Sequence, residues 1–161
     1  MRINGWICTF LMAFLCSEIA WADDLKTVEI WKNLFTLNSG QSTDSNTTFL
    51  ITNEGVIVVD TRVTPDEARK VKGEIRKQTQ LPVLYVINTH YHGDHVFGNQ
   101  VFKDSHTIIA HENVRKSLED GSRKEHLNFI KNLNIPGTEE TVLTLPNVIF
   151  KEKMDIWAGG Y

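Results

Sequence analysis

The chain has 161 residues, of which 41% are hydrophobic and 23% are charged, a composition typical of one globular domain with its own core. Its 17 basic and 20 acidic residues give a formal net charge of -3 and are scattered rather than grouped in blocks. The sequence therefore lacks the basic patch that a nucleic-acid-binding protein carries, and we expect no nucleic-acid partner.

The first 22 residues have the pattern of an export signal. Arg2 supplies a positive end, residues 6–16 form an uncharged apolar run, and a small-x-small triplet ends at Ala22. The apolar run is too short to cross the roughly 30 Å of hydrocarbon in a bilayer. We therefore predict a signal peptide over residues 1–22, a periplasmic or secreted protein over residues 23–161, and no stable membrane anchor.

Both cysteines, Cys8 and Cys16, lie inside the predicted signal, so residues 23–161 contain no cysteine. A metal site in that part of the chain has to be built from histidine and carboxylate side chains. Such a donor set favours zinc or another borderline divalent ion over sulfur-bound clusters.

The predicted elements begin with strands. Residues 28–37 alternate loosely between apolar and polar residues and predict an edge strand, and residues 38–46 form a polar loop. Residues 48–52 and 56–60 are short apolar runs separated by three residues that end in Gly55. This spacing predicts a tight hairpin of two mostly buried strands.

A helix and a buried strand follow. Thr64 as the cap, Pro65 at the first helical position and Glu67 three residues after the cap predict a helix that runs to about Thr79. Residues 83–87 are almost unbroken apolar sequence, which is typical of a strand buried on both faces in a parallel sheet. The strand, helix and strand together predict an α/β fold.

The rest of the chain continues this alternation less regularly. The expected strands and helices are strand 107–110, helix 112–118, helix 123–133, and short strands or loop segments over 142–145, 148–150 and 156–157.

The residues that follow the buried strand point to a metal site. His90, His92, Asp94 and His95 place four ligand-type side chains within six positions. In an extended segment, residues two apart point the same way, so His90 and His92 can hold one ion. Gly93 then permits a turn that brings Asp94 and His95 to a neighbouring position. We predict two half-sites in one loop, each needing ligands from elsewhere.

This stretch resembles the signature of the metallo-β-lactamase superfamily. Thr89, Gly98 and Asn99 also fit many members, and Asp60 resembles the family's acidic residue on the strand before the first helix. The order of predicted elements over residues 28–110 is similar as well. The resemblance implies that residues 23–161 form the first half of the family's αββα sandwich, incomplete at the C-terminus.

The resemblance also implies roles for the residues of the cluster. His90 and His92 would hold the first of two zinc ions, Asp94 and His95 the second, and Asp60 would brace the loop from behind. The family's reaction is attack by a metal-bound hydroxide, which Asp94 would orient. The implied activity is zinc-dependent hydrolysis of an ester, thioester or amide (β-lactam-like) bond in a small molecule.

The family takes its remaining zinc ligands from the back half of the fold, and we assign none of them in this chain. His106, His111 and His126 follow the cluster, but none has the flanking residues typical of those ligands. We therefore expect this chain to be inactive alone, and its uncovered sheet face to promote dimerisation or aggregation. The alternatives are a non-catalytic metal-binding module and an iron-dependent oxidoreductase of the same fold, since histidine and carboxylate also suit iron.

Overall fold

The computed structural model describes residues 25–38, 45–105, 107–132 and 137–161. The predicted signal peptide lies outside the described residues. In the described part of the chain, no helix is both long and apolar enough to span a bilayer.

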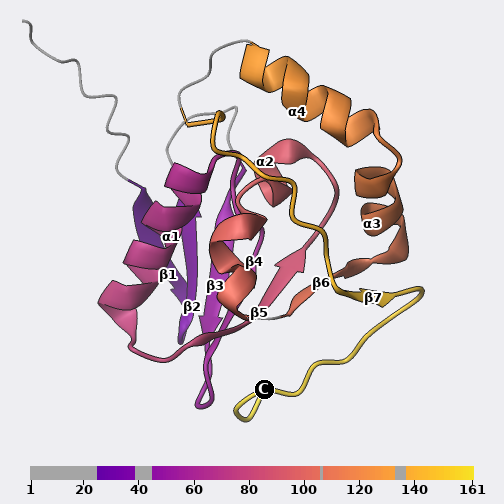
Figure 1. Ribbon diagram of the computed structural model, residues 1–161. Coiled ribbons are helices and arrows are strands. Elements are labelled where there is room, and N and C mark those ends of the chain that lie inside the picture. Colours follow the sequence, from indigo (N-terminus) through magenta and orange to yellow (C-terminus); the bar gives the residue numbers. More distant parts are fainter. Residues whose placement is uncertain (1–24, 39–44, 106, 133–136) are drawn as a thin grey trace, which may run out of the picture.

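Seven strands form one mixed sheet in which their order in space is their order in the chain (Figure 1). The antiparallel part comprises β1 (Lys26–Trp31), β2 (Leu34–Asn38), β3 (Thr47–Ile51) and β4 (Val56–Val59). The strands that continue parallel from β4 are β5 (Val83–Asn88), β6 (Ile108–His111) and β7 (Val148–Phe150). The predicted α/β class is confirmed.

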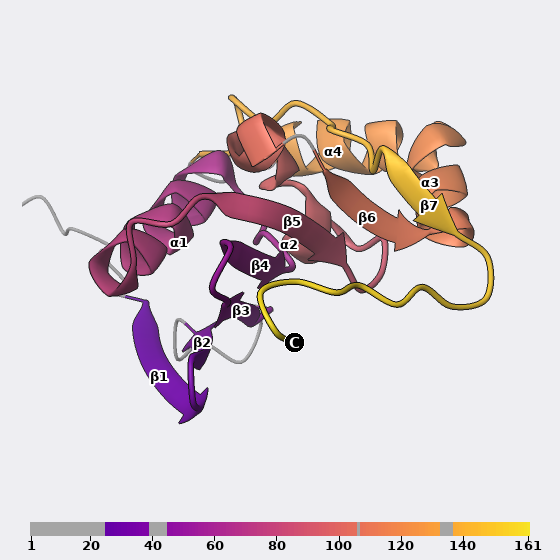
Figure 2. The ribbon, with the colours of Figure 1, turned by 90° about the horizontal axis from the view of Figure 1, so that it is seen from below.

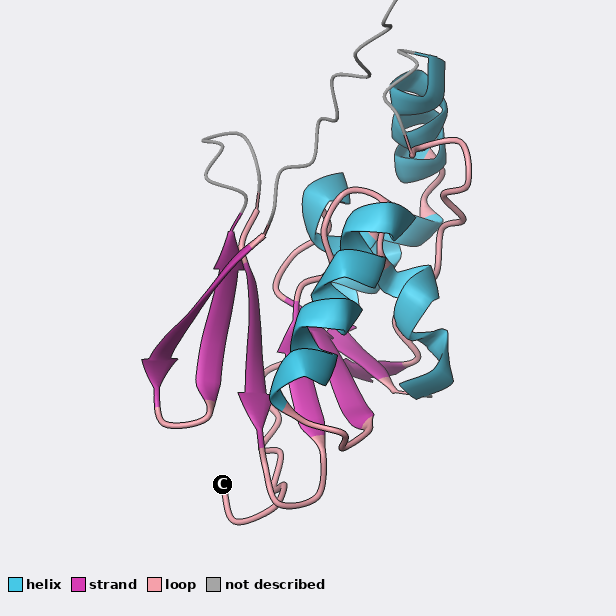
Figure 3. Ribbon diagram, turned by 90° about the vertical axis from the view of Figure 1, so that its left-hand side faces the viewer, coloured by secondary structure: helices cyan, strands magenta, loops and turns pink. Residues whose placement is uncertain are grey.

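The helices form a second layer on one side of this sheet (Figure 3). They are α1 (Pro65–Gln78), α2 (Gly93–Val96), the 3-10 helix η1 (Asn99–Ser105), α3 (Glu112–Glu119) and α4 (Ser122–Asn132). Residues 151–161 run below β6 and β5 in Figure 2, on the side away from the helices, toward the turn between β3 and β4. There an added Cβ on Gly159 would lie 2.5 Å from the backbone nitrogen of Asn53.

The start of α1 follows the predicted capping pattern. The Thr64 hydroxyl accepts a hydrogen bond from the backbone N–H of Glu67 at 3.2 Å, and Pro65 occupies the first helical position. Such a cap stabilises a helix by about 1 kcal/mol. The Glu67 carboxylate reaches back to the N–H of Val63 at 3.3 Å rather than to that of Thr64. The N-terminus of α1 is thereby held in place directly after the loop that leaves β4.

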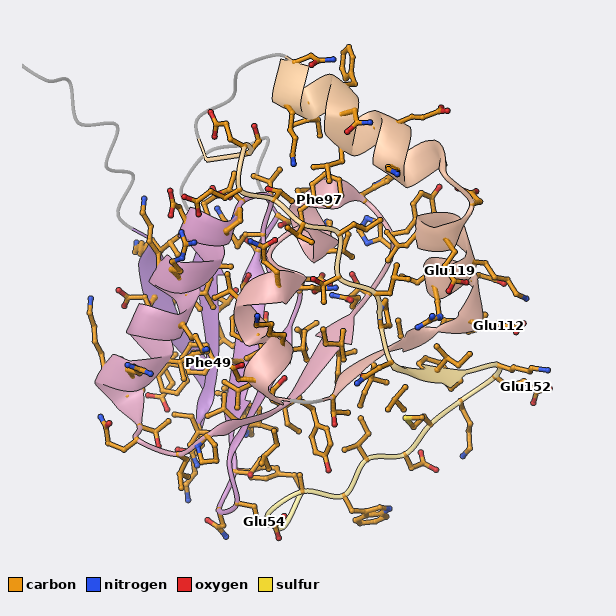
Figure 4. The ribbon with its side chains drawn as sticks, viewed as in Figure 1. Phe49, Glu54, Phe97, Glu112, Glu119 and Glu152 are labelled. Carbon is orange, nitrogen blue, oxygen red and sulfur yellow. The ribbon has the colours of Figure 1, made fainter. Side chains whose placement is uncertain are left out.

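The apolar faces of the helices and the sheet meet in two clusters. Phe35 and Phe49 stack with ring centroids 4.9 Å apart beneath α1, and Val71 and Ile75 of that helix pack in the same cluster. The second cluster surrounds Phe97, under α3 and α4. Figure 4 shows Phe49 between α1 and the strands, and Phe97 beside α2.

One prediction about the strands is wrong in detail. The single edge strand expected over residues 28–37 is a hairpin, because Asn33 adopts a left-handed backbone with φ 62° and turns the chain. The segment 142–145, expected to be a short strand or a loop segment, is a loop.

The burial expected for β5 is also wrong. Val86 and Asn88 are buried on the helix side, but Tyr85 and Ile87 are only partly covered, because the helices cover one face of the sheet. Register places Ile57 beside Tyr85 on this second face. We call this side the open face: it comprises the partly exposed residues Leu50, Ile57, Val59, Tyr85 and Ile87.

Candidate functional site

The predicted metal ligands lie where β5 ends. His90 and His92 occupy the segment between β5 and α2, and Asp94 and His95 belong to the single turn of α2. The parallel neighbour β4 ends at the same edge, so Asp60 lies beside the loop. All five residues singled out from the sequence therefore come to one edge of the sheet.

Gly93 is required here by packing. An added Cβ would lie 2.5 Å from the Phe97 ring, which is 1% exposed and belongs to the second core cluster. The backbone at Gly93 is not in the left-handed region. The turn expected at Gly93 is thus the first residue of α2, and the buried Phe97 ring packs against it.

His90 and His92 form the first pair. His90 Nε2 lies 3.0 Å from His92 Nδ1, and the two rings meet edge to face with centroids 4.7 Å apart. His92 precedes α2, and its side chain makes no capping hydrogen bond. Burial, and then the nearby rings of His95 and His92, hold the pKa of His90 below its ordinary value. This shift favours the neutral form of His90, which is the form in which histidine binds metal ions.

Asp94 and His95 form the second pair. Asp94 Oδ2 lies 3.3 Å from His95 Nε2. The His95 ring also packs on the His90 ring with centroids 3.9 Å apart. The two pairs are therefore neighbours.

Asp60 lies behind the second pair. Its carboxylate is buried and accepts three hydrogen bonds: from the Thr89 N–H at 2.9 Å, from the Thr89 hydroxyl at 2.7 Å and from His95 Nδ1 at 2.6 Å. The Asp60 backbone has φ 63°, a left-handed conformation that Asp tolerates better than most residues. Asp60 thus contacts both ends of the loop segment that carries the ligands.

The histidine and carboxylate groups of the two pairs are of the type that binds a borderline divalent ion, but each pair has fewer ligands than a protein zinc site needs. Two nitrogen ligands of one tetrahedral zinc ion lie about 3.4 Å apart, close to the separation of the His90 and His92 nitrogens. Within the described residues, however, no group of three or more His, Cys, Asp or Glu side chains is arranged to hold one ion. Each pair could thus supply only part of a coordination shell, since protein zinc sites use at least three protein ligands.

The other described histidines are engaged elsewhere. His111 Nδ1 accepts a hydrogen bond from the Asn113 N–H and caps α3, and His111 Nε2 contacts the Lys151 carbonyl. His126 is exposed on α4 and lies 6.3 Å from the Phe97 ring. Neither histidine contributes to the two pairs.

Polar residues outside the cluster also hold the loop, and the sequence pattern missed them. The Ser45 hydroxyl donates to the Asp94 carbonyl, the Thr61 N–H donates to the His95 carbonyl, and the Asn88 amide donates to the same carbonyl. The only local signal was a polar residue, Asn88, at the end of an apolar strand. Thr61 and Ser45 lie in ordinary polar loop sequence, so no local pattern indicated that they would bond to the backbone of the ligand segment.

Comparisons with known proteins concern the family and the fold of the chain. A family model described as "Metallo-beta-lactamase superfamily" matches residues 42–151. The solved structure "Metallo-beta-lactamase from Pontibacter korlensis" superposes with a TM-score of 0.65 and 17% identity, over 84% of this chain and 57% of that one. At this identity the likeness shows the fold alone.

A curated relative shares a shorter segment. "Linear primary-alkylsulfatase" of Pseudomonas sp. (strain ATCC 19151) is 37% identical over 59 residues, which is 37% of this chain and 11% of that protein. The chain therefore spans about a tenth of the curated relative's length, and just over half of the solved structure's.

Proposed function

Since the chain belongs to the metallo-beta-lactamase superfamily, we propose that it is the metal-binding part of a zinc-dependent hydrolase. The observation that carries the proposal is the convergence of two ligand pairs at one sheet edge. His90 faces His92 at 3.0 Å, Asp94 faces His95 at 3.3 Å, and the two pairs touch through their rings. In this proposal the first pair binds one ion and the second pair binds the other.

A bound zinc ion supplies water activation at neutral pH and polarisation of a substrate oxygen. The side chains of this chain supply binding and orientation. Asp60 accepts a hydrogen bond from the Nδ1–H of His95, so His95 Nε2 keeps its lone pair and faces Asp94. In this proposal Asp94, the more exposed of the two carboxylates, would help to hold the second ion and would orient the attacking water molecule by accepting a hydrogen bond from it.

The proposed substrate is a small molecule with an ester, thioester or amide bond, β-lactams included. The similarity to a protein named as an alkylsulfatase adds sulfate esters to the compounds worth testing. Because each ion receives only two donors from the described residues, we propose that this chain binds zinc weakly by itself and needs further ligands for turnover.

The same pairwise arrangement supports a second function, a metal-binding module without catalysis. In that case the chain binds an ion through His90 and His92 and shows no hydrolysis when loaded with zinc. Metal stoichiometry and hydrolysis assays on one preparation separate the two functions.

The first test is zinc stoichiometry and affinity of the purified chain, measured by competition with a chromophoric chelator. The variant with His90→Ala and His92→Ala should lose at least one ion, because one complete ligand pair is removed. His126→Ala is the matched control, since that histidine lies on α4 outside the pairs, and it should bind zinc like the unaltered chain. Equal zinc binding by the double variant and the control would overturn the proposal.

A further inference from the structure

Two buried amide side chains meet beside residues 89–95, the segment that carries the two ligand pairs and that we call the metal loop. Asn99, at the start of η1, is 0% exposed, and Asn88, at the end of β5, is 3% exposed. Asn99 Oδ1 accepts from the Thr61 hydroxyl at 2.9 Å and from the Asn88 amide at 3.0 Å. Asn99 Nδ2 donates to Asn88 Oδ1 at 2.9 Å and to the Thr144 carbonyl at 3.0 Å. All four hydrogen-bonding positions of the Asn99 amide are therefore used.

The pair holds the loop through the main chain of a ligand residue. The His95 carbonyl accepts from the Thr61 N–H at 2.9 Å and from the Asn88 amide at 3.3 Å, and the Thr61 hydroxyl lies 3.2 Å away. Both residues that donate to this carbonyl are themselves bonded to Asn99. Asp60 orients the His95 ring, whereas the amide pair fixes the backbone on which that ring stands.

The neighbouring glycine explains how Asn99 reaches this position. Gly98 donates its N–H to the Arg62 carbonyl at 3.0 Å, and an added Cβ would lie 1.9 Å from the Thr61 carbonyl oxygen. The backbone at Gly98, after α2, therefore packs directly against the backbone of residues 61–62, after β4. Only glycine permits this approach, which places the next side chain between Thr61 and Asn88.

We propose that Asn99, through Asn88 and Thr61, is a positioning residue that sets the His95 half of the metal loop for ligand binding. The proposal rests on the proposed function. An asparagine is needed because one planar side-chain amide has to accept two hydrogen bonds and donate two at this position. An apolar residue would leave the buried side-chain oxygen of Asn88 without the hydrogen bond from Asn99 and would remove the donor to the Thr144 carbonyl, which is costly.

The test compares Asn99→Ala with Val71→Ala, a core substitution in α1 that does not touch the loop. Both variants lose stability, so zinc affinity is measured where both remain folded. Removal of an outer partner of a metal ligand typically lowers affinity about 10–100-fold. We expect Asn99→Ala to lose at least about tenfold in zinc affinity, and Val71→Ala to keep the affinity of the unaltered chain. Equal affinity in the two variants would overturn the proposal.

Amide hydrogen exchange of the metal-free chain supplies a readout that does not depend on zinc binding. The Thr61 amide donates to the His95 carbonyl, whereas the Val56 amide donates to the Pro82 carbonyl at the far end of the sheet. In Asn99→Ala, exchange at Thr61 should accelerate by at least about tenfold more than at Val56, as expected for local opening. Uniform acceleration would mean a general loss of stability and would overturn the proposal.

Two other results of these experiments would also bear on the role of Asn99. If Asn99→Ala does not fold, Thr61→Val replaces it, because it removes only one hydroxyl and keeps the side-chain shape; the same selective acceleration and a smaller loss of affinity are expected. If the unaltered chain binds no zinc, the proposed function fails, and the exchange measurement alone then decides whether Asn99 positions the loop.

Discussion

Gly98 and Gly73 are glycines with opposite surroundings. The position of an added Cβ on Gly98 is blocked by the Thr61 carbonyl oxygen and by the side chain of Ala68, at 1.9 and 2.7 Å. Gly73 lies on the exposed side of α1 and has nothing within 4 Å of the same position. The first glycine is needed for close packing, and the second only lowers the stability of its helix.

We therefore expect Gly98→Ala and Gly73→Ala to change stability in opposite directions. Gly98→Ala should lower the free energy of unfolding by about 3 kcal/mol, since backbone would have to move. Gly73→Ala should raise it by about 1 kcal/mol, the difference in helix propensity. Urea unfolding followed by circular dichroism measures both changes. A stable Gly98→Ala variant would contradict the close approach on which the Asn99 argument depends.

Among the elements, β1 and α1 are tied together by a polar contact. The Thr27 hydroxyl of β1 donates to the Glu74 carboxylate at 2.9 Å, and Lys77 one turn along α1 donates to the same carboxylate at 2.6 Å. The hydrogen bond from Lys77, followed by that from Thr27, holds the pKa of Glu74 below its ordinary value. The hydrogen bond between Thr27 and Glu74 thus connects the edge strand β1 to α1 in the helix layer.

This contact gives stability a small pH dependence. Because the pKa of Glu74 is lower in the folded chain, its contribution is present above the unfolded pKa of about 4.3 and is lost as pH falls through the folded pKa. Lys77 is 69% exposed, so screening limits the effect to less than about 1 kcal/mol. Glu74→Gln should be less stable than the unaltered chain at pH 7 and equally stable at acid pH. Chemical unfolding at a series of pH values measures the difference, and a gap that widens at low pH would refute the assignment.

In the described part of the chain, the helices cover one face of the sheet, whereas only residues 151–161 run along the open face. On the helix side, Val58 and Val86 are fully buried, whereas Ile57 and Ile87 on the open face remain partly exposed. Apolar sheet surface in contact with water favours association with any surface that covers it. The expected dimerisation or aggregation is therefore a prediction for the whole chain rather than for any single residue.

We predict that the purified chain self-associates with increasing concentration and that Ile57→Thr with Ile87→Thr reduces this association. Threonine keeps the β-branched shape that suits a strand, so the double variant should remain folded. Size-exclusion chromatography with light scattering measures the molecular mass over a concentration series. Val58→Thr is the control for the covered face, where the buried hydroxyl should destabilise folding instead. A monomer at all concentrations before substitution would refute the prediction.

Local patterns were enough to predict much of the fold and the ligand cluster. The cap at Thr64 and the apolar spacing after it predicted α1 to within a residue or two, because these signals act within one turn. The hairpin of β3 and β4 followed from two apolar runs around a short turn ending in Gly55. The grouping of His90 and His92 was predictable because residues two apart in extended chain share a side.

Contacts between distant residues had no such signal. The bond from Thr61 to Asn99 joins residues 38 apart, and the bond from Ser45 to Asp94 joins residues 49 apart. Neither contact produces a local pattern in the sequence, because packing between the elements brings these residues together. The same holds for β5, whose apolar run indicated burial on both faces although the helices cover only one. Short-range residue patterns thus determined the elements and the candidate ligand residues, because these signals act between neighbours in the chain. The packing of the helices on the sheet decided which polar groups hold residues 89–95 and which sheet face the helices leave open.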